Sequence, residues 1–83
     1  MTVLAKTSEY LVEFEGHHLT IARREDGHCL LMSTRRIRGD FLHLQKRLGS
    51  ELAIEKMIVI ATAMGHLWQP LYKARAMPDL LAP

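Results

Sequence analysis

Residues 9–34 read EYLVEFEGHHLTIARREDGHCLLMST, and this stretch decides the fold. Gly16-His17 suits a two-residue hairpin turn with glycine first, and Asp26-Gly27 is the dipeptide favoured in the mirror-image turn that matches strand twist. Two such turns predict three antiparallel strands, over 9–15, 18–24 and 28–34.

The two predicted turns also fix which residues lie opposite one another. With two-residue loops, Glu15 faces His18 in the first hairpin and Glu25 faces His28 in the second. Because side chains alternate along a strand, the large apolar side chains then fall on one face of the sheet. These are Tyr10, Val12, Phe14, Leu19, Ile21, Leu30 and Met32. A slip by one residue in either hairpin would scatter them over both faces, so their agreement supports the assignment.

The chain has 83 residues, of which 48% are hydrophobic. This length suits one small domain and leaves little room for a large substrate pocket. Cys29 is the single cysteine, which excludes an internal disulfide and favours a reducing compartment. The first six residues lack the order of a secretory signal, and no uncharged apolar stretch reaches the ~20 residues that span a membrane. We therefore expect a cytoplasmic protein without membrane contact.

Two or three helices are expected after the strands. Asp40 suits an N-cap, Gly49 suits the end of the same helix, and Ser50 can cap the next helix at once. Pro70 ends that second helix or begins a third. The expected helices span 40–48, 50–69 and 70–77. The predicted fold is therefore a single α+β domain, a three-stranded antiparallel β-meander followed by two or three α-helices.

The expected helix over 50–69 is apolar around most of its circumference. Its polar strip is narrow and consists of Glu51, Glu55, Thr62 and His66. Such a helix is normally buried on several sides, which predicts a central position in the fold. The alternative is that part of this helix, with Ile58 and Trp68 as candidate residues, docks on a second copy of the chain or on another protein.

Five histidines and one cysteine invite a metal-site interpretation, with His17-His18 and His28-Cys29 as the candidate pairs. The predicted register places these pairs at opposite ends of the second strand, about 23 Å apart at ~3.3 Å per residue. Metal ligands must converge within a few Å of one ion. We therefore expect no metal site and no cofactor.

No catalytic residue is expected either. His28 points to the sheet face opposite Cys29 and cannot act as its base. Glu9, Glu13 and Glu15 line an edge strand without a cleft, and the five glycines form no phosphate-binding pattern. The sequence predicts a protein that is not an enzyme.

Positive charge is concentrated in one segment, because residues 35–48 carry five basic side chains and one acidic side chain, an excess of 5 − 1 = +4. The five are Arg35, Arg36, Arg38, Lys46 and Arg47. Arginines at a strand-to-helix junction can contact phosphates, so nucleic-acid binding is one hypothesis. The acidic outer face of the first strand and the lack of an aromatic series for base stacking count against it.

The face of the sheet opposite the core suggests protein binding instead. The predicted register aligns Leu11, Ala22 and Leu31 there as an apolar row with a polar rim, which is the pattern of an interface core. The alternative is that the N-terminal segment folds over this row.

Together these features favour a small non-catalytic regulatory or inhibitory protein that docks on a larger protein partner. Its small size and its lack of expected catalytic residues resemble those of phage or plasmid accessory proteins, including host-defence inhibitors. This is an analogy of size and composition only. A homodimer is a further expectation, and a nucleic-acid-binding regulator is the alternative function.

Overall fold

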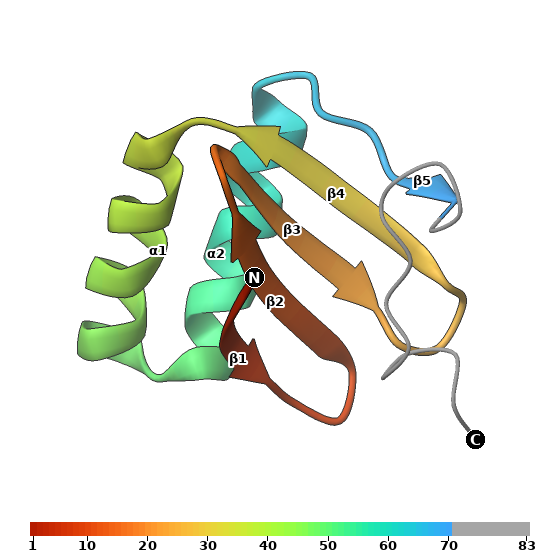
Figure 1. The fold of residues 1–83 in the computed structure, drawn as a ribbon. Coiled ribbons are helices and arrows are strands. Elements are labelled where there is room, and N and C mark those ends of the chain that lie inside the picture. The colour runs from red at the N-terminus through yellow and green to blue at the C-terminus, as the bar shows by residue number, and fades with distance from the viewer. Residues whose placement is uncertain (71–83) are drawn as a thin grey trace.

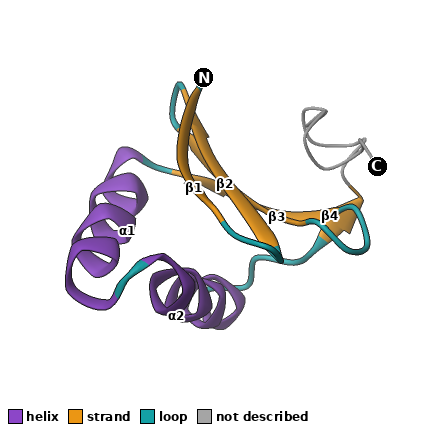
Figure 2. Ribbon diagram, turned by 90° about the horizontal axis from the view of Figure 1, so that it is seen from below, coloured by secondary structure: helices purple, strands orange, loops and turns teal. Residues whose placement is uncertain are grey.

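Within residues 1–70, five strands form one antiparallel sheet, and two helices pack together on one of its faces (Figures 1 and 2). The structure is a computed structural model and describes residues 1–70. Its elements are β1 (Thr2–Lys6), β2 (Tyr10–Glu15), β3 (His18–Arg23), β4 (His28–Ser33), α1 (Arg35–Leu48), α2 (Ser50–Ala63) and β5 (Gln69–Pro70). The strand order is β1-β2-β3-β4-β5, so each strand pairs with its neighbour in the chain. The α+β class and the meander are confirmed, but the sheet has two more strands than the sequence predicts.

The first hairpin has the predicted turn and register. Glu15 pairs with His18, and Gly16 adopts φ +60° at the first turn position. Within residues 1–70 only glycines have positive φ, so His17 has negative φ, as in the turn type with glycine first. The register then holds along both strands, to the pair of Tyr10 and Arg23.

The second hairpin departs from the predicted register by two residues. His28 pairs with Arg23 rather than with Glu25, so the loop has four residues instead of two. The Asp26 side chain accepts a hydrogen bond from the backbone N–H of His28 at 3.0 Å, and Gly27 N–H donates to the Arg23 carbonyl at 3.2 Å. The Asp26 side chain therefore bonds the backbone of the residue two positions later, within a loop of four residues rather than two.

A shift of two residues leaves every side chain on its predicted face, because the side-chain period of a strand is two. Five of the seven predicted core residues of the sheet are buried in one cluster with the helices, namely Val12, Leu19, Ile21, Leu30 and Met32. Tyr10 and Phe14 are half-buried against that cluster. The predicted core face is therefore confirmed although the second register is wrong.

Both additional strands lie at the edges of the sheet. β1 pairs with β2 through an irregular register between Val3 and Ala5, so the N-terminal segment extends the sheet rather than folding over its outer face. β5 pairs with the start of β4, where Cys29 lies opposite Gln69. Neither segment shows the alternating apolar pattern by which a strand is recognised in a sequence.

The first helix begins five residues earlier than predicted. Its N-cap is Thr34, whose Oγ1 accepts a hydrogen bond from Arg36 N–H at 3.1 Å, and Asp40 lies inside the helix. The helix starts earlier because Ile37, one turn before the buried Phe41, is also buried and extends the apolar side of α1 towards its N-terminus. The predicted helix over 40–48 is therefore too short.

The second helix ends at Ala63 rather than at residue 69. Gly65 has φ +91°, its N–H donates to the Thr62 carbonyl, and His66 N–H donates to the Ala61 carbonyl. This pair of bonds around a left-handed glycine is the Schellman helix end. The predicted third helix over 70–77 falls, except for Pro70 in β5, outside the described residues.

No helix within residues 1–70 combines the length and the apolar content needed to cross a membrane.

Candidate docking surface

The predicted outer-face row does not present an exposed apolar strip. Because of the shifted register, Ala22 pairs with Cys29, and Leu31 lies opposite Thr20. Leu11 and Ala22 are only 2% and 0% exposed, and Leu31 is half-buried.

The other two predicted protein-binding residues, Ile58 and Trp68, are half-buried and pack against the core. The Arg23 guanidinium lies 3.9 Å from the centre of the Trp68 ring and also forms an ion pair of 3.1 Å with Asp26. A cation stacked on an indole stabilises this packing. Trp68 thus helps to hold the segment after α2 against the hairpin of β3 and β4.

An exposed apolar surface lies instead on α2. Four large apolar side chains there are at least two-fifths exposed, and we call them the α2 patch. They are Leu52 (51%), Val59 (66%), Ile60 (43%) and Met64 (62%). Leu52 and Val59 lie opposite the buried side of α2, which consists of Ala53, Ile54, Met57 and Ala61. Ile60 and the C-cap Met64 lie at the edge of that buried side, where they face α1. The prediction of a helix buried on several sides is therefore wrong, because α2 packs through one side only.

A groove adjoins the α2 patch where the first half of α1 faces the second half of α2. Its volume is about 250 Å³. Its lining residues, which define the α1–α2 groove, are Met32, Thr34, Arg36, Ile37, Asp40, Met57, Ile60 and Met64. Three of the five methionines of the chain are among them. Methionine is flexible and polarisable, so these walls can adapt to apolar side chains of different shape.

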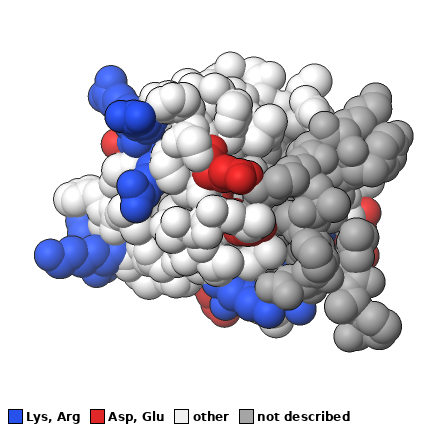
Figure 3. Space-filling model, in the orientation of Figure 1, with Lys and Arg blue, Asp and Glu red and all other residues white. Residues whose placement is uncertain are grey.

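The structure places all five predicted nucleic-acid-binding residues on α1, where all are exposed. Figure 3 shows basic side chains along the side of the molecule that α1 forms. Arg35 and Arg38 contact the first hairpin: Arg35 Nε donates to His17 Nδ1 at 3.1 Å, and the Arg38 guanidinium lies 4.9 Å from the Phe14 ring centre. Arg36 lies on the other side of the helix and lines the α1–α2 groove.

The remaining two basic residues, Lys46 and Arg47, lie in the last turn of α1. Positive charge is favourable there, because a helix dipole is negative at its C-terminus. No acidic residue occupies the first turn, where three arginines cluster at the positive end of the dipole.

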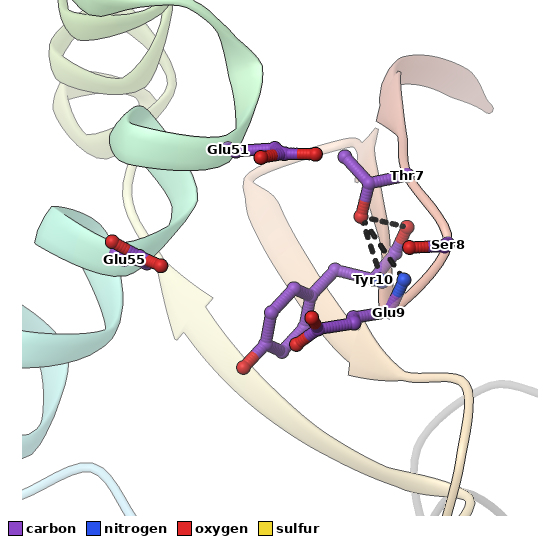
Figure 4. A pocket seen from close by; sticks show the side chains of 6 residues that line it. All are labelled: Thr7, Ser8, Glu9, Tyr10, Glu51 and Glu55. Atoms are coloured by element: carbon purple, nitrogen blue, oxygen red, sulfur yellow. Dashed lines mark hydrogen bonds between the residues drawn. The ribbon is translucent and has the colours of Figure 1, made fainter.

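A second, acidic hollow lies between the turn that joins β1 to β2 and the first half of α2 (Figure 4). Thr7 Oγ1 orders this turn by accepting hydrogen bonds from the N–H groups of Tyr10 and Glu9 at 3.0 and 3.3 Å. Burial raises the pKa of the Tyr10 hydroxyl, and the charge of Glu9 adds to the shift. Glu51 and Glu55 face this turn from α2.

The volume of this hollow is about 30 Å³, enough for about one water molecule and too small for an organic substrate. Among residues 1–70 no group of three or more histidine, cysteine, aspartate or glutamate side chains could hold a metal ion. Cys29 is buried, and this burial raises the pKa of its thiol, which disfavours the reactive thiolate.

Sequence reasoning missed the α2 patch and chose the neighbouring Ile58 instead. The signal that could have found the patch is helical phase. Once Ile54, Met57 and Ala61 are assigned to the core side, Leu52 and Val59 must point away from it, because each residue advances the helix by about 100°.

None of the protein-family models, curated proteins or solved structures compared with this chain matches it significantly. Functional inference for this protein therefore begins from the α2 patch and the α1–α2 groove.

Proposed function

We propose that this chain is a small non-catalytic regulatory or inhibitory protein that docks on a larger protein through the α2 patch and the α1–α2 groove. The exposed apolar side of α2 is the observation that supports the proposal. Leu52, Val59 and Met64 are each at least half exposed, although the same helix buries four apolar residues on its core side. Large exposed apolar side chains that gather on one element often mark an interaction site.

The α2 patch belongs to a regular helix that is anchored to the sheet by Ala53, Ile54 and Met57. A partner would therefore meet side chains whose backbone is already ordered, which lowers the entropic cost of binding. Burial of apolar area contributes about 25 cal/mol per Å². Burial of the α2 patch against a partner would therefore contribute favourable free energy to binding, because these side chains stay exposed when the chain folds alone.

The proposal is tested by comparing capture of partner proteins by wild-type chain, by Val59→Asp and by Thr62→Asp. Both substitutions add one negative charge to an exposed position of α2, but only Val59 belongs to the α2 patch. We expect a protein captured from the native host by wild type and by Thr62→Asp, and lost with Val59→Asp. Circular dichroism checks that both variants stay folded. Equal capture by all three proteins would contradict docking through the α2 patch.

A second copy of the chain is the competing occupant of the same surface. Light scattering of the purified protein over a range of concentrations separates the two cases. A dimer that Val59→Asp dissociates would show that the α2 patch is a homodimer interface rather than a docking site for a different protein.

Nucleic-acid binding is retained as a second candidate function because α1 gathers five basic side chains on its exposed side. Its test is the affinity for duplex DNA between 50 and 200 mM salt. Neutralisation of several phosphates would weaken binding by about a hundredfold or more over this range. An affinity that changes little with salt, or that survives Arg35→Gln together with Arg36→Gln, would rule this function out.

A further inference from the structure

The exposed side of α1 carries basic residues at both of its ends and none in the middle. At about 100° per residue, six residues fall within an arc of about 120° that points away from the buried Ile37 and Phe41. We call this arc the basic face of α1. All of its residues are exposed, and they are Arg35, Arg36, Gly39, His43, Lys46 and Arg47.

The four basic residues of this face form two pairs that are aligned along the helix. We call Arg35 with Arg36 the N-terminal pair, and Lys46 with Arg47 the C-terminal pair. Corresponding members of the two pairs are eleven residues apart, and eleven residues make about three helical turns. They therefore lie at nearly the same angle around α1. At about 1.5 Å per residue, the two pairs are separated by about 16.5 Å along the helix.

The charge of the basic face is not balanced within residues 1–70. None of its four basic side chains forms an ion pair with another residue of this part of the chain. Asp40, the acidic residue of α1, lies outside the arc and lines the α1–α2 groove. The N-terminal pair also lies at the positive end of the helix dipole, which favours an anion there as well. The basic face therefore suits a strongly anionic partner.

The middle of the face favours nucleic acid over an acidic protein. Gly39 and His43 lie between the two pairs, so the face lacks the apolar and aromatic centre of a typical protein interface. Lysine and arginine contacts to phosphates supply essentially all of the affinity when a protein binds nucleic acid without reading its sequence. The acidic outer face of β2 does not oppose such binding, because the helices pack on the other face of the sheet (Figure 2).

The form of the nucleic acid follows from the aromatic residues and from the spacing of the two pairs. All tyrosine, phenylalanine and tryptophan side chains within residues 1–70 are buried or half-buried, so none offers an exposed ring on which unpaired bases could stack. The major groove of B-form DNA is about 12 Å wide and has phosphates along both sides, whereas the minor groove is only about 6 Å wide. Two pairs about 16.5 Å apart match the two sides of a major groove.

We infer that α1 lies across the major groove of duplex DNA, with the N-terminal pair on the phosphates of one strand and the C-terminal pair on those of the other. Gly39 has no side chain, and the phosphates hold α1 at the rim of a groove about 8.5 Å deep. Base edges are therefore not read, and binding is independent of sequence. This inference rests on the second candidate function and names the form of nucleic acid and the contacts.

The probe is a fluorescein-labelled DNA duplex of 20 base pairs, whose binding is followed by anisotropy between 50 and 200 mM salt. Because about four phosphates are neutralised, we expect a slope of about −3.6 when the logarithm of the affinity is plotted against the logarithm of the salt concentration. A duplex of unrelated sequence should bind within about twofold of the first. A single strand of the same length should bind at least about tenfold more weakly.

Double variants test the two pairs separately. Arg35→Gln with Arg36→Gln should make the slope shallower by about 1.8, and Lys46→Gln with Arg47→Gln should do so by the same amount. Equal effects are expected because each pair contacts one strand. Circular dichroism checks that both variants stay folded.

A matched comparison of single variants controls for net charge. Arg47→Gln should make the slope shallower by about 0.9 and weaken binding at 100 mM salt by about five- to tenfold. Arg24→Gln removes the same charge, but Arg24 lies in the loop between β3 and β4, which is far from α1 (Figure 1). It should therefore weaken binding by less than about twofold.

Equal affinity for duplex and single strand would overturn the inference, and so would equal losses with Arg24→Gln and Arg47→Gln. Polyglutamate that displaces the duplex as well as unlabelled duplex does would overturn it in favour of an acidic protein partner. If the duplex binds with a steep salt dependence but only one double variant changes the slope, the nucleic-acid function stands and the placement across the groove is wrong. If no duplex binds, both fail, and Val59→Asp still decides docking through the α2 patch.

Discussion

Asp26 organises the loop between β3 and β4 through its carboxylate. One oxygen accepts the backbone N–H of His28 at 3.0 Å, and the other pairs with the Arg23 guanidinium at 3.1 Å. Desolvation raises the pKa of this carboxyl, but the His28 hydrogen bond and the Arg23 charge outweigh it and hold the pKa below its ordinary value. The folded state therefore favours the ionised form of Asp26.

This lowered pKa makes one contribution to stability dependent on pH. Since the folded-state pKa lies below the unfolded one, the contribution is complete above the unfolded pKa of about 3.9 and is lost as the pH falls through the folded value. Asp26→Asn keeps an oxygen for the His28 N–H but lacks the charge. We expect wild type to be more stable than Asp26→Asn in urea at pH 5, and the difference to shrink towards pH 2. A difference that stays constant over this range would contradict the assignment.

Two glycines of the helices should respond in opposite directions to alanine. Gly49 is the single residue between α1 and α2 and has φ +84° and ψ 166°, a conformation essentially confined to glycine. Gly49→Ala should destabilise the fold by about 1–3 kcal/mol. Gly39 lies inside α1 with open space around its Cα, so Gly39→Ala should stabilise by about 0.5–1 kcal/mol. Urea unfolding measures both, and equal effects would show that the inter-helix link is not strained.

Elements differ in how strongly their ends are encoded in the sequence. For α1, both Thr34 and Asp40 are residue types that favour an N-cap, but only Thr34 accepts a helix N–H, from Arg36. Thr34→Ala should therefore cost about 0.5–2 kcal/mol. Asp40→Ala should change the stability by no more than about 0.5 kcal/mol. Thermal or urea unfolding of the two variants checks this order, and a larger loss for Asp40→Ala would place the helix start where the sequence alone suggests it.

The core face of the sheet is more predictable than the ends of its elements or the register of the second hairpin. Gly16 encodes its turn directly, because its positive φ requires glycine at that position. Asp26-Gly27 encodes a turn but not the loop length, since the side chain of Asp26 bonds to the His28 N–H and widens the loop. The side chains still lie on their predicted faces of the sheet, because the error shifts the strand by an even number of residues.

At the scale of the whole molecule, the candidate site was less predictable than the fold. The sequence shows that α2 is apolar almost all round, but the number of elements that cover it depends on how the chain packs. Once α1 and the sheet contact one side only, Leu52 and Val59 remain exposed on the other. The sequence alone shows that basic residues are concentrated in this segment. It does not show that Arg35 faces the first hairpin while Arg36 faces the α1–α2 groove, because this follows from the start of α1 at Arg35.

The rate at which a reagent modifies the Cys29 thiol reports on unfolding of the whole molecule. Its side chain is fully buried on the sheet face opposite the helices, and burial raises the pKa of the thiol, so both access and thiolate content are low in the folded state. A thiol reagent at pH 8 should therefore modify Cys29 at least about a hundredfold more slowly than a short peptide of residues 27–31. Its rate should rise with urea in parallel with unfolding measured by circular dichroism. Rapid modification without urea would show instead that this face opens while the core between sheet and helices stays intact. Leu11 and Ala22 would then be accessible to a binding partner.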